Sequence, residues 1–196
     1  MSVFRQLMMR RYHSAVNYMN LDIVGSPTIQ DGVVSNFSTS NYLESSETYD
    51  FSQSWEIVLK LKTDVSDSSG YLRIFGNDNA VFASLVGIGQ QVGVWARNTN
   101  NEYIANGVYS PVDSFPNNST KFVKFTFTGT QYLLALSDDG TTWTTTNTIN
   151  NTTNIGNNKT IKLGAAAGTQ YFNGSIDINN SYIIIDGTKY IFTIGA

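Results

Sequence analysis

The stretch Lys121-Phe122-Val123-Lys124-Phe125-Thr126-Phe127-Thr128 places apolar side chains at every second position. Successive side chains of an extended chain point to opposite sides, so the odd-numbered positions from Val123 to Phe127 form one wholly apolar face. The even-numbered positions from Lys124 to Thr128 are all polar. This alternation predicts a β-strand that covers a core with one face and meets solvent with the other.

The segment after this strand predicts two hairpins in series. Gly129 ends the first strand, and Tyr132–Ser137 is again rich in apolar residues. The next turn, Asp138-Asp139-Gly140, ends in an Asp-Gly pair, which suits a tight hairpin that needs positive φ. The chain then returns as a third strand, and we expect Trp143 on it to pack in the core. Antiparallel hairpins of this kind are typical of a β-sandwich.

The rest of the chain also divides into short strands separated by polar turns. Trp55–Thr63 is the clearest strand of the first half, with one face made of Trp55, Ile57, Leu59 and Leu61. Together with strands expected at 71–75, 80–87 and 91–97, it fits a four-stranded meander. Short edge strands are expected at 21–24 and 32–34. Late strands are expected at 160–164, 171–178, 181–185 and 189–193, with a hairpin turn at Asp186-Gly187.

Length and composition favour one domain that is stable without covalent cross-links. The chain has 196 residues, of which 41% are hydrophobic and 13% aromatic, and it has no cysteine. Disulfides, thiolate metal sites and thiol catalysis are therefore excluded. No apolar run approaches the roughly 20 residues of a membrane-spanning helix, so we expect no membrane insertion. Residues 22–196 contain 9 basic and 15 acidic residues, a net charge of −6, which disfavours binding to nucleic acid.

The first twenty residues differ from the rest and predict a separate N-terminal arm, followed by a sandwich domain at 21–196. The arm contains all four methionines, the only histidine (His13) and three arginines with no acid. Methionine and arginine are common in protein interfaces, so we expect the arm to attach to a partner. A short helix or strand packed on its own domain, or a disordered start, remains the alternative. The expected attachment residues are Phe4, Arg5, Leu7, Met8, Met9, Arg10 and Arg11.

Three segments, in order along the chain, resemble a known family. They are Ser54–Leu61, Gly129–Trp143 and Tyr171–Ile183, and they resemble the concanavalin A-like or laminin-G-like jelly-roll domains found in tail, fibre and capsid-decoration proteins of bacteriophages. The resemblance spans residues 20–196 and implies a sandwich of two antiparallel sheets. In the last segment, Gly174 lacks a side chain at a position where a neighbouring strand or the opposite sheet can come close, so it should resist substitution.

Residues for catalysis are scarce, and we expect no enzyme. Jelly-roll glycoside hydrolases need two carboxylates on one strand face, but the four glutamates (Glu44, Glu47, Glu56 and Glu102) do not form such a pair in the sequence. A Ser/His/Asp triad would depend on His13, in the unusual arm. We expect no cofactor and no metal. Calcium at a loop rim is the less favoured alternative, and its candidate ligands are Asp64, Asp67, Asp78, Asp138 and Asp139.

One turn combines the groups that sugars require. Sugar binding uses an aromatic face for stacking and planar polar groups for the hydroxyls. The candidate glycan-binding residues around this turn are Trp95, Arg97, Asn98, Asn100 and Tyr103. The alternative, which we favour, is that Trp95 belongs to the core and that Val92 or Val94 turns outward.

These observations give three hypotheses for function. The leading one is a structural protein at the virion surface, a capsid decoration, head fibre or tail fibre component, attached to other virion proteins by its arm and exposing a lectin-like domain. Such a protein would be a homo-oligomer, with a trimer typical of fibres. The second is a module that recognises host surface glycans. A jelly-roll glycoside hydrolase is the least favoured.

Overall fold

The computed structural model describes residues 16–63, 71–77, 81–86, 90–97, 102–156, 158–165 and 171–195, with the backbone alone for 71–77, 81–86, 97 and 104–108. Every regular element in these residues is a β-strand, so the predicted all-β class is confirmed. The described parts of the chain contain no apolar helix of membrane-spanning length. The attachment residues predicted between Phe4 and Arg11 lie outside the described residues.

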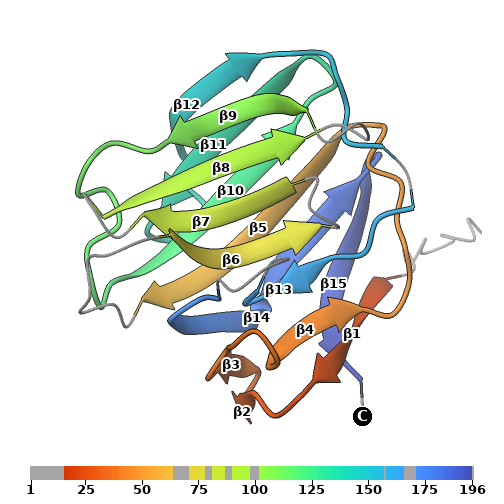
Figure 1. Ribbon diagram of the computed structural model, residues 1–196, viewed down its shortest axis with the longest axis vertical. Helices are drawn as coiled ribbons and strands as arrows, with labels where there is room; N and C mark the ends of the chain where they lie inside the picture. The colour runs from red at the N-terminus through yellow and green to blue at the C-terminus, as the bar shows by residue number, and fades with distance from the viewer. Residues whose placement is uncertain are drawn as a thin grey trace, which may run out of the picture.

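One layer of the molecule consists of six strands in the order β12-β11-β10-β5-β14-β15 (Figure 1). A small hairpin of β2 (Thr28–Gln30) and β3 (Val33–Ser35) joins this layer, because β3 pairs with β14. The bounds of the six strands are β5 Trp55–Thr63, β10 Thr120–Phe127, β11 Gln131–Ser137, β12 Thr144–Asn150, β14 Gly174–Ile185 and β15 Thr188–Ile194.

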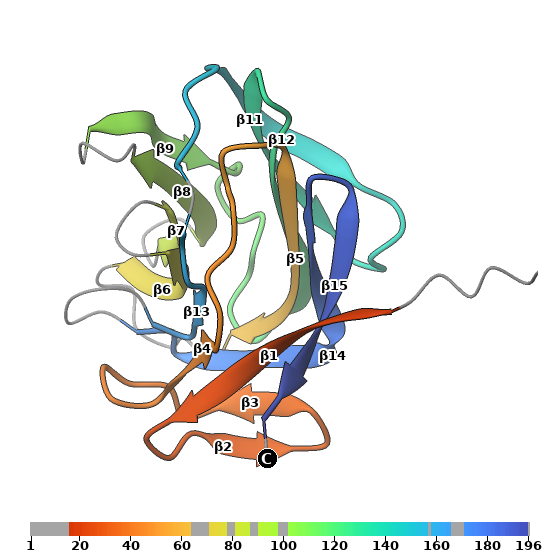
Figure 2. The same cartoon turned by 90° about the vertical axis from the view of Figure 1, so that its right-hand side faces the viewer.

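The second layer has the order β4-β13-β6-β7-β8-β9 and faces the first (Figure 2). Strand β1 (Asn17–Val24) connects the two layers, since it pairs parallel with β15 and antiparallel with β4. The sheet therefore passes from one layer into the other through β1. The bounds in this layer are β4 Tyr42–Ser45, β13 Lys162–Leu163, β6 Tyr71–Asn77, β7 Val81–Val86, β8 Gln91–Arg97 and β9 Tyr103–Tyr109.

The core lies between the layers, and the alternation seen in the sequence explains which side chains fill it. In β10, Val123, Phe125 and Phe127 are buried, and the residues between them are only partly so. Trp55 lies at the centre of an aromatic cluster whose other members are Phe51, Phe125, Phe127 and Tyr132. Burying a large apolar side chain stabilises a fold by about 1.5–3 kcal/mol, so this cluster stabilises the packing of β10 and β11 with β5.

The meander lies elsewhere than the sequence predicts. Strand β5 pairs with β10 and β14 in the first layer and not with β6. The observed meander is β6-β7-β8-β9 in the second layer. The physical reason is that the alternating pattern identifies strands but not their partners, which depend on contacts between distant segments.

The two late strands predicted at 171–178 and 181–185 are parts of one strand, β14, with a large bulge. Asp177 pairs with Lys60 and Tyr182 with Val58, so residues 178–181 stand opposite Leu59 alone. A polar Asn-Asn pair at this place resembles a turn, but the chain continues in the same direction after it. The predicted Asp186-Gly187 hairpin turn is confirmed, with positive φ at both residues.

Trp143 is not a core residue, contrary to the prediction. It is the last residue of the six-residue loop between β11 and β12 and lies half-buried on the outer face of the first layer. There its ring contacts the Phe122 ring at 6.5 Å between centroids, and Lys124 Nζ lies 4.4 Å from its centroid. The loop is longer than a two-residue Asp-Gly turn, so the chain re-enters the sheet after Trp143.

Strand β1 starts at Asn17, and its Met19 and Leu21 side chains are fully buried. Residues 17–20, which the sequence predicts as part of the arm, thus form the first half of a strand that is hydrogen-bonded to β15 on one edge.

The first and last strands of the sheet order, β12 and β9, lie against each other. Asn147 Nδ2 in β12 donates to the Tyr109 carbonyl in β9 at 3.1 Å.

Candidate functional site

Trp95 lies on the face of β8 that points away from the core. Val92, Val94 and Ala96 are fully buried in the core, whereas Trp95 shares its face with Gly93. The favoured alternative is therefore right that Trp95 is buried and wrong that Val92 or Val94 turns outward. The Trp95 side chain is 7% exposed and meets the Tyr109 ring edge to face, at 5.5 Å between centroids and 89° between planes.

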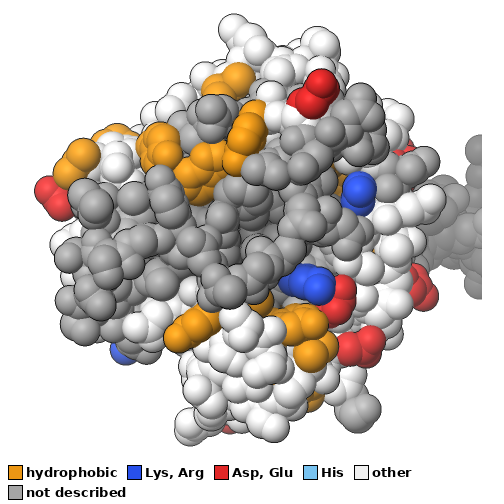
Figure 3. Space-filling view, viewed as in Figure 1, with side chains coloured by type: hydrophobic (Ala, Val, Ile, Leu, Met, Phe, Trp, Pro, Cys, Tyr) orange, Lys and Arg blue, Asp and Glu red, His pale blue; other side chains and the backbone are white. Residues whose placement is uncertain are grey.

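Tyr103 is the exposed aromatic residue of the predicted group. It is the first residue of β9, its side chain is 50% exposed, and it pairs in register with Arg97 at the end of β8. In Figure 3, hydrophobic side chains gather over the part of this face where β8 and β9 lie. The structure thus brings Trp95, Arg97 and Tyr103 to neighbouring positions of one hairpin. Asn98 and Asn100 lie outside the described residues.

Tyr109 and the role of Gly93 were not predicted from the sequence. A Cβ atom at Gly93 would lie 2.9 Å from both the Trp95 and the Tyr109 ring, so the absence of a side chain gives the two rings their place. The signal was present in the sequence, because a glycine two positions before a tryptophan in a strand occupies the same face. Tyr109 could be found only by pairing β9 with β8 in the observed register.

A network of side-chain and backbone bonds supports this region at the end of β9. Gln91 Nε2 donates to the Ser110 carbonyl at 2.6 Å, and the Ser110 hydroxyl accepts from the Val92 N–H at 2.9 Å. Ser110 Oγ is also 2.6 Å from Ser114 Oγ. Because Ser110 is buried, these bonds fix the chain that leaves β9 and hold Tyr109 beside Trp95.

The glutamates that a hydrolase would use are engaged in cross-strand ion pairs. Glu44 in β4 lies directly opposite Lys162 in β13, at 3.4 Å between Oε1 and Nζ. Glu56 lies 3.7 Å from Lys124, with Thr126 donating to the same carboxylate oxygen at 3.4 Å. Both carboxylates therefore contact a lysine on a neighbouring strand, and they lie in different layers, so they do not form the acid and base pair of a glycoside hydrolase. His13, which a triad would need, lies outside the described residues.

The loop aspartates proposed as calcium ligands are used by the loop itself where the structure describes them. Asp139 accepts hydrogen bonds from the N–H groups of Thr142 and Thr141 and from the Ser137 hydroxyl, which hold the pKa of its carboxyl well below the ordinary value. Asp138 pairs with Lys121. Within the described ranges, no three acidic or histidine side chains gather as a metal ion would require. Asp64, Asp67 and Asp78 lie outside those ranges.

Comparison with known proteins finds similarity in structure but not in sequence. No family model matches the chain, and no curated protein matches it. The binding domain of Paraclostridial Mosquitocidal Protein 1 superimposes with a TM-score of 0.62 at 14% identity, over 90% of this chain and 45% of that one.

Two further solved structures are similar to this chain. The exoplasmic/lumenal domain of VIP36, in its Ca²⁺/Man-bound form, has a TM-score of 0.55 at 11% identity, over 90% of this chain and 84% of that one. Mouse laminin α1 chain domains LG4-5 have a TM-score of 0.56 at 12% identity, over 79% of this chain and 40% of that one. At these identities the similarity concerns the fold alone. The chain therefore has the jelly-roll sandwich fold of concanavalin A-like and laminin-G-like domains, as the sequence predicts.

Proposed function

We propose that this domain binds glycans without catalysis, through the outer face of the β8-β9 hairpin. The observation that carries the proposal is the half-exposed Tyr103 ring on the hairpin that also carries the perpendicular Trp95–Tyr109 pair. Packed rings give an exposed aromatic side chain a rigid base, and aromatic faces with polar neighbours suit the C–H groups and hydroxyls of sugars. The VIP36 domain with bound mannose and the binding domain of the mosquitocidal protein support the proposal by analogy of fold.

The residues of this proposed site have different roles. Tyr103 would contact the sugar, with Arg97 at the register position opposite it. Trp95 is largely buried and would act by positioning, since its ring is held between Gly93 and Tyr109. Replacing Trp95 would therefore disturb the fold as well as binding, so it makes a poor probe.

The test is a screen of the purified domain against bacterial surface polysaccharides and a glycan array, with Tyr103→Ala as the variant. Tyr18→Ala is the matched control, because Tyr18 is a similarly exposed tyrosine on β1, which five strands separate from β9 in the sheet order. We expect Tyr103→Ala to lose roughly tenfold or more in affinity with an unchanged melting temperature, and Tyr18→Ala to lose none. Equal binding by both variants, or no binding across the panel, would refute the proposal.

We further propose that the domain is displayed on a bacteriophage particle, as a virion protein that the arm attaches. Support comes from the resemblance of Ser54–Leu61, Gly129–Trp143 and Tyr171–Ile183, and from the three arginines without an acid in the arm. Strand β1 is paired on both edges and buries Met19 and Leu21, so the described sheet needs nothing before Asn17 to complete its hydrogen bonding there. A homo-oligomer, which fibres and decorations commonly form, belongs to this proposal and is tested by light scattering of the full chain.

A further inference from the structure

A cleft lies on the outer face of the first layer, remote from the β8-β9 hairpin. It has a volume of about 190 Å³ and is lined by Val33, Lys60, Leu61, Lys62, Thr120, Ser175 and Asp177. Strand β5 forms its floor, with β10 on one side and β14 on the other, and the β2-β3 hairpin adds Val33 as a wall. The cleft is smaller than the 300–1,000 Å³ typical of drug-sized ligands, so it suits a single ring or a small charged group.

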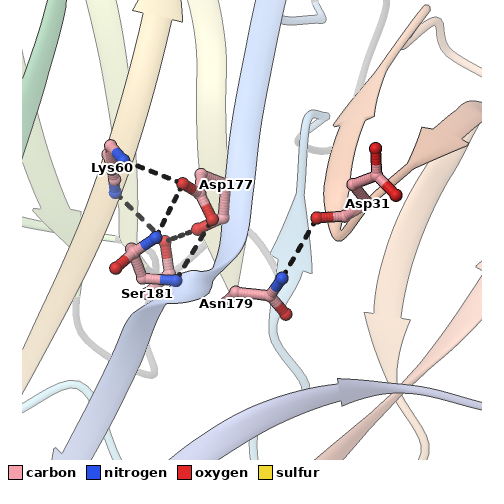
Figure 4. A network of polar contacts seen from close by, with 6 residues as sticks. Asp31, Lys60, Asp177, Asn179 and Ser181 are labelled. Carbon is pink, nitrogen blue, oxygen red and sulfur yellow. Dashed lines mark hydrogen bonds and ion pairs between the residues drawn. The ribbon is translucent and has the colours of Figure 1, made fainter.

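On one side of the cleft, the charge of Lys60 is paired with that of Asp177. Lys60 Nζ lies 2.9 Å from Asp177 Oδ2, and Figure 4 shows this pair beside the β14 bulge. Burial opposes ionisation of Asp177, but hydrogen bonds from Lys60 and Asn180 and the charge of Lys60 outweigh it and lower the pKa of its carboxyl. Ser181 Oγ accepts from the Lys60 N–H at 3.0 Å and donates to the Asp177 carbonyl at 2.7 Å. These contacts make this pair a fixed part of the sheet.

The next set of cross-strand partners consists of Lys62, Thr120 and Ser175, and we call it the Lys62 row. Its contacts differ from those of the Lys60 pair. Lys62 lies directly opposite Thr120 of β10 on one side and Ser175 of β14 on the other, so the three side chains share one face. Throughout the described residues, the Lys62 ammonium and the two hydroxyls make no side-chain hydrogen bond, and Lys62 has no ion pair. One cation thus stands between two hydroxyl groups at the edge of the cleft, and none of the described carboxylates pairs with it.

The geometry of this row is held by Gly174. A Cβ atom there would lie 2.3 Å from the Lys62 carbonyl oxygen, so β14 reaches β5 closely only because the residue is glycine. The close approach sets Ser175 beside Lys62. The row is therefore a consequence of the fixed backbone and not of a mobile loop.

We propose that the Lys62 row binds the carboxylate of an acidic sugar, such as a uronic acid residue of a polysaccharide. An ammonium with two flanking hydroxyls offers donors to a single negative charge, and charge-assisted hydrogen bonds are the strong ones. The neighbouring Asp177 carboxylate opposes a doubly charged group such as phosphate. A carboxylated pyranose ring fills the cleft and can use its hydroxyls, whereas an acidic peptide side chain leaves most of it empty. This site is separate from the proposed β8-β9 site and does not depend on it.

The test is a titration of the full chain with D-glucuronate, followed by NMR chemical shifts, with D-glucose, N-acetyl-aspartate and inorganic phosphate as comparison ligands. We expect glucuronate to bind, Lys62→Gln to weaken it roughly tenfold or more, and added salt to weaken it too. Lys189→Gln is the matched control, because Lys189 is on the same layer but stacks on Tyr182 away from the cleft. It should bind as the wild type does.

Three outcomes would overturn the proposal: equal binding of glucose, unchanged binding by Lys62→Gln, or equal binding of N-acetyl-aspartate, which would assign the cleft to an acidic peptide. Stronger binding of phosphate would also overturn it. Tyr103→Ala separates the two sites. If it abolishes glycan binding on the array and leaves glucuronate binding intact, both proposals stand as independent sites.

Discussion

At the scale of single residues, two strand glycines determine how closely their neighbours can pack. Gly174 allows β14 to approach β5, and Gly93 makes room for the Trp95 and Tyr109 rings. Both lie in strands and not in turns, so their value comes from the missing side chain and not from an unusual φ. Glycine usually weakens the interior of a strand, but at these two positions a larger residue would overlap a neighbouring atom.

Gly174→Ala should destabilise the domain by about 1–3 kcal/mol, because the new methyl group would overlap the Lys62 carbonyl and the Phe172 ring. Urea denaturation followed by tryptophan fluorescence measures the change. Gly195→Ala is the control, since its nearest contacts would be ordinary ones at 3.6 and 3.8 Å. If both variants are equally stable, the close approach of β14 to β5 has been misjudged.

At the scale of one element, the bulge in β14 shows how polar side chains replace lost backbone pairing. Residues 178–181 cannot all pair with β5, and the Ser181 hydroxyl takes the hydrogen bond of the Lys60 N–H instead. The bulge also supports the β2-β3 hairpin, because Asn179 Nδ2 donates to the Asp31 carbonyl at 3.1 Å. Asp177 is the last residue paired before the bulge, and it lies directly opposite Lys60, with which it forms an ion pair.

Because of Asp177, the free energy of unfolding should depend on pH. Its pKa is lowered in the folded state from an ordinary value of 3.8, so its ionised form stabilises the fold above that value. This contribution is lost as the pH falls below about 3.8 and through the folded-state pKa. We expect Asp177→Asn to be less stable than the wild type at pH 7 and to show a weaker loss between pH 5 and pH 2 in thermal melts.

The control for this experiment is Asp113→Asn, because Asp113 is an exposed turn residue with positive φ, a conformation that asparagine also accepts. Its pH profile should match that of the wild type. An unchanged profile for Asp177→Asn would mean that the Lys60 pair contributes nothing to acid sensitivity.

At the scale of the whole molecule, β1 is the strand that makes one sheet of two layers. It pairs with β15 in the first layer and with β4 in the second, and it buries Met19 and Leu21 between them. Its parallel pairing with β15 sets Asn17 beside Tyr190 and Leu21 beside Ile194, so the described chain starts at one end of this strand pair and finishes at the other. The residues of the predicted arm are therefore joined directly to the strand that connects the two layers.

Deleting residues 2–15 should leave a folded domain with a melting temperature within a few degrees of the full chain, since β1 remains intact. Deleting residues 2–24 should abolish cooperative unfolding, because it removes the connection between the layers. Circular dichroism and calorimetry distinguish the two. Loss of folding in the shorter deletion would contradict a detachable arm.

The fold class and most of the buried strand faces can be predicted from the amino-acid sequence alone. The alternation in β5 and β10 predicts Ile57, Leu59, Val123 and Phe125 as core residues, and all four are buried, because a side-chain period of two is a local property of an extended chain. The close approach at Gly174 was also predicted from the strand pattern.

The pairing of the strands, and the side chains that meet on their outer faces, depend on the three-dimensional arrangement of the whole chain. Trp143 lies outside the core, β5 is separated from the β6-β9 meander, and Lys62 meets Thr120 and Ser175 from strands far away in the sequence. Register between distant strands results from packing of the complete core and from bulges such as the one in β14. The candidate cleft therefore exists only once the sheet has formed.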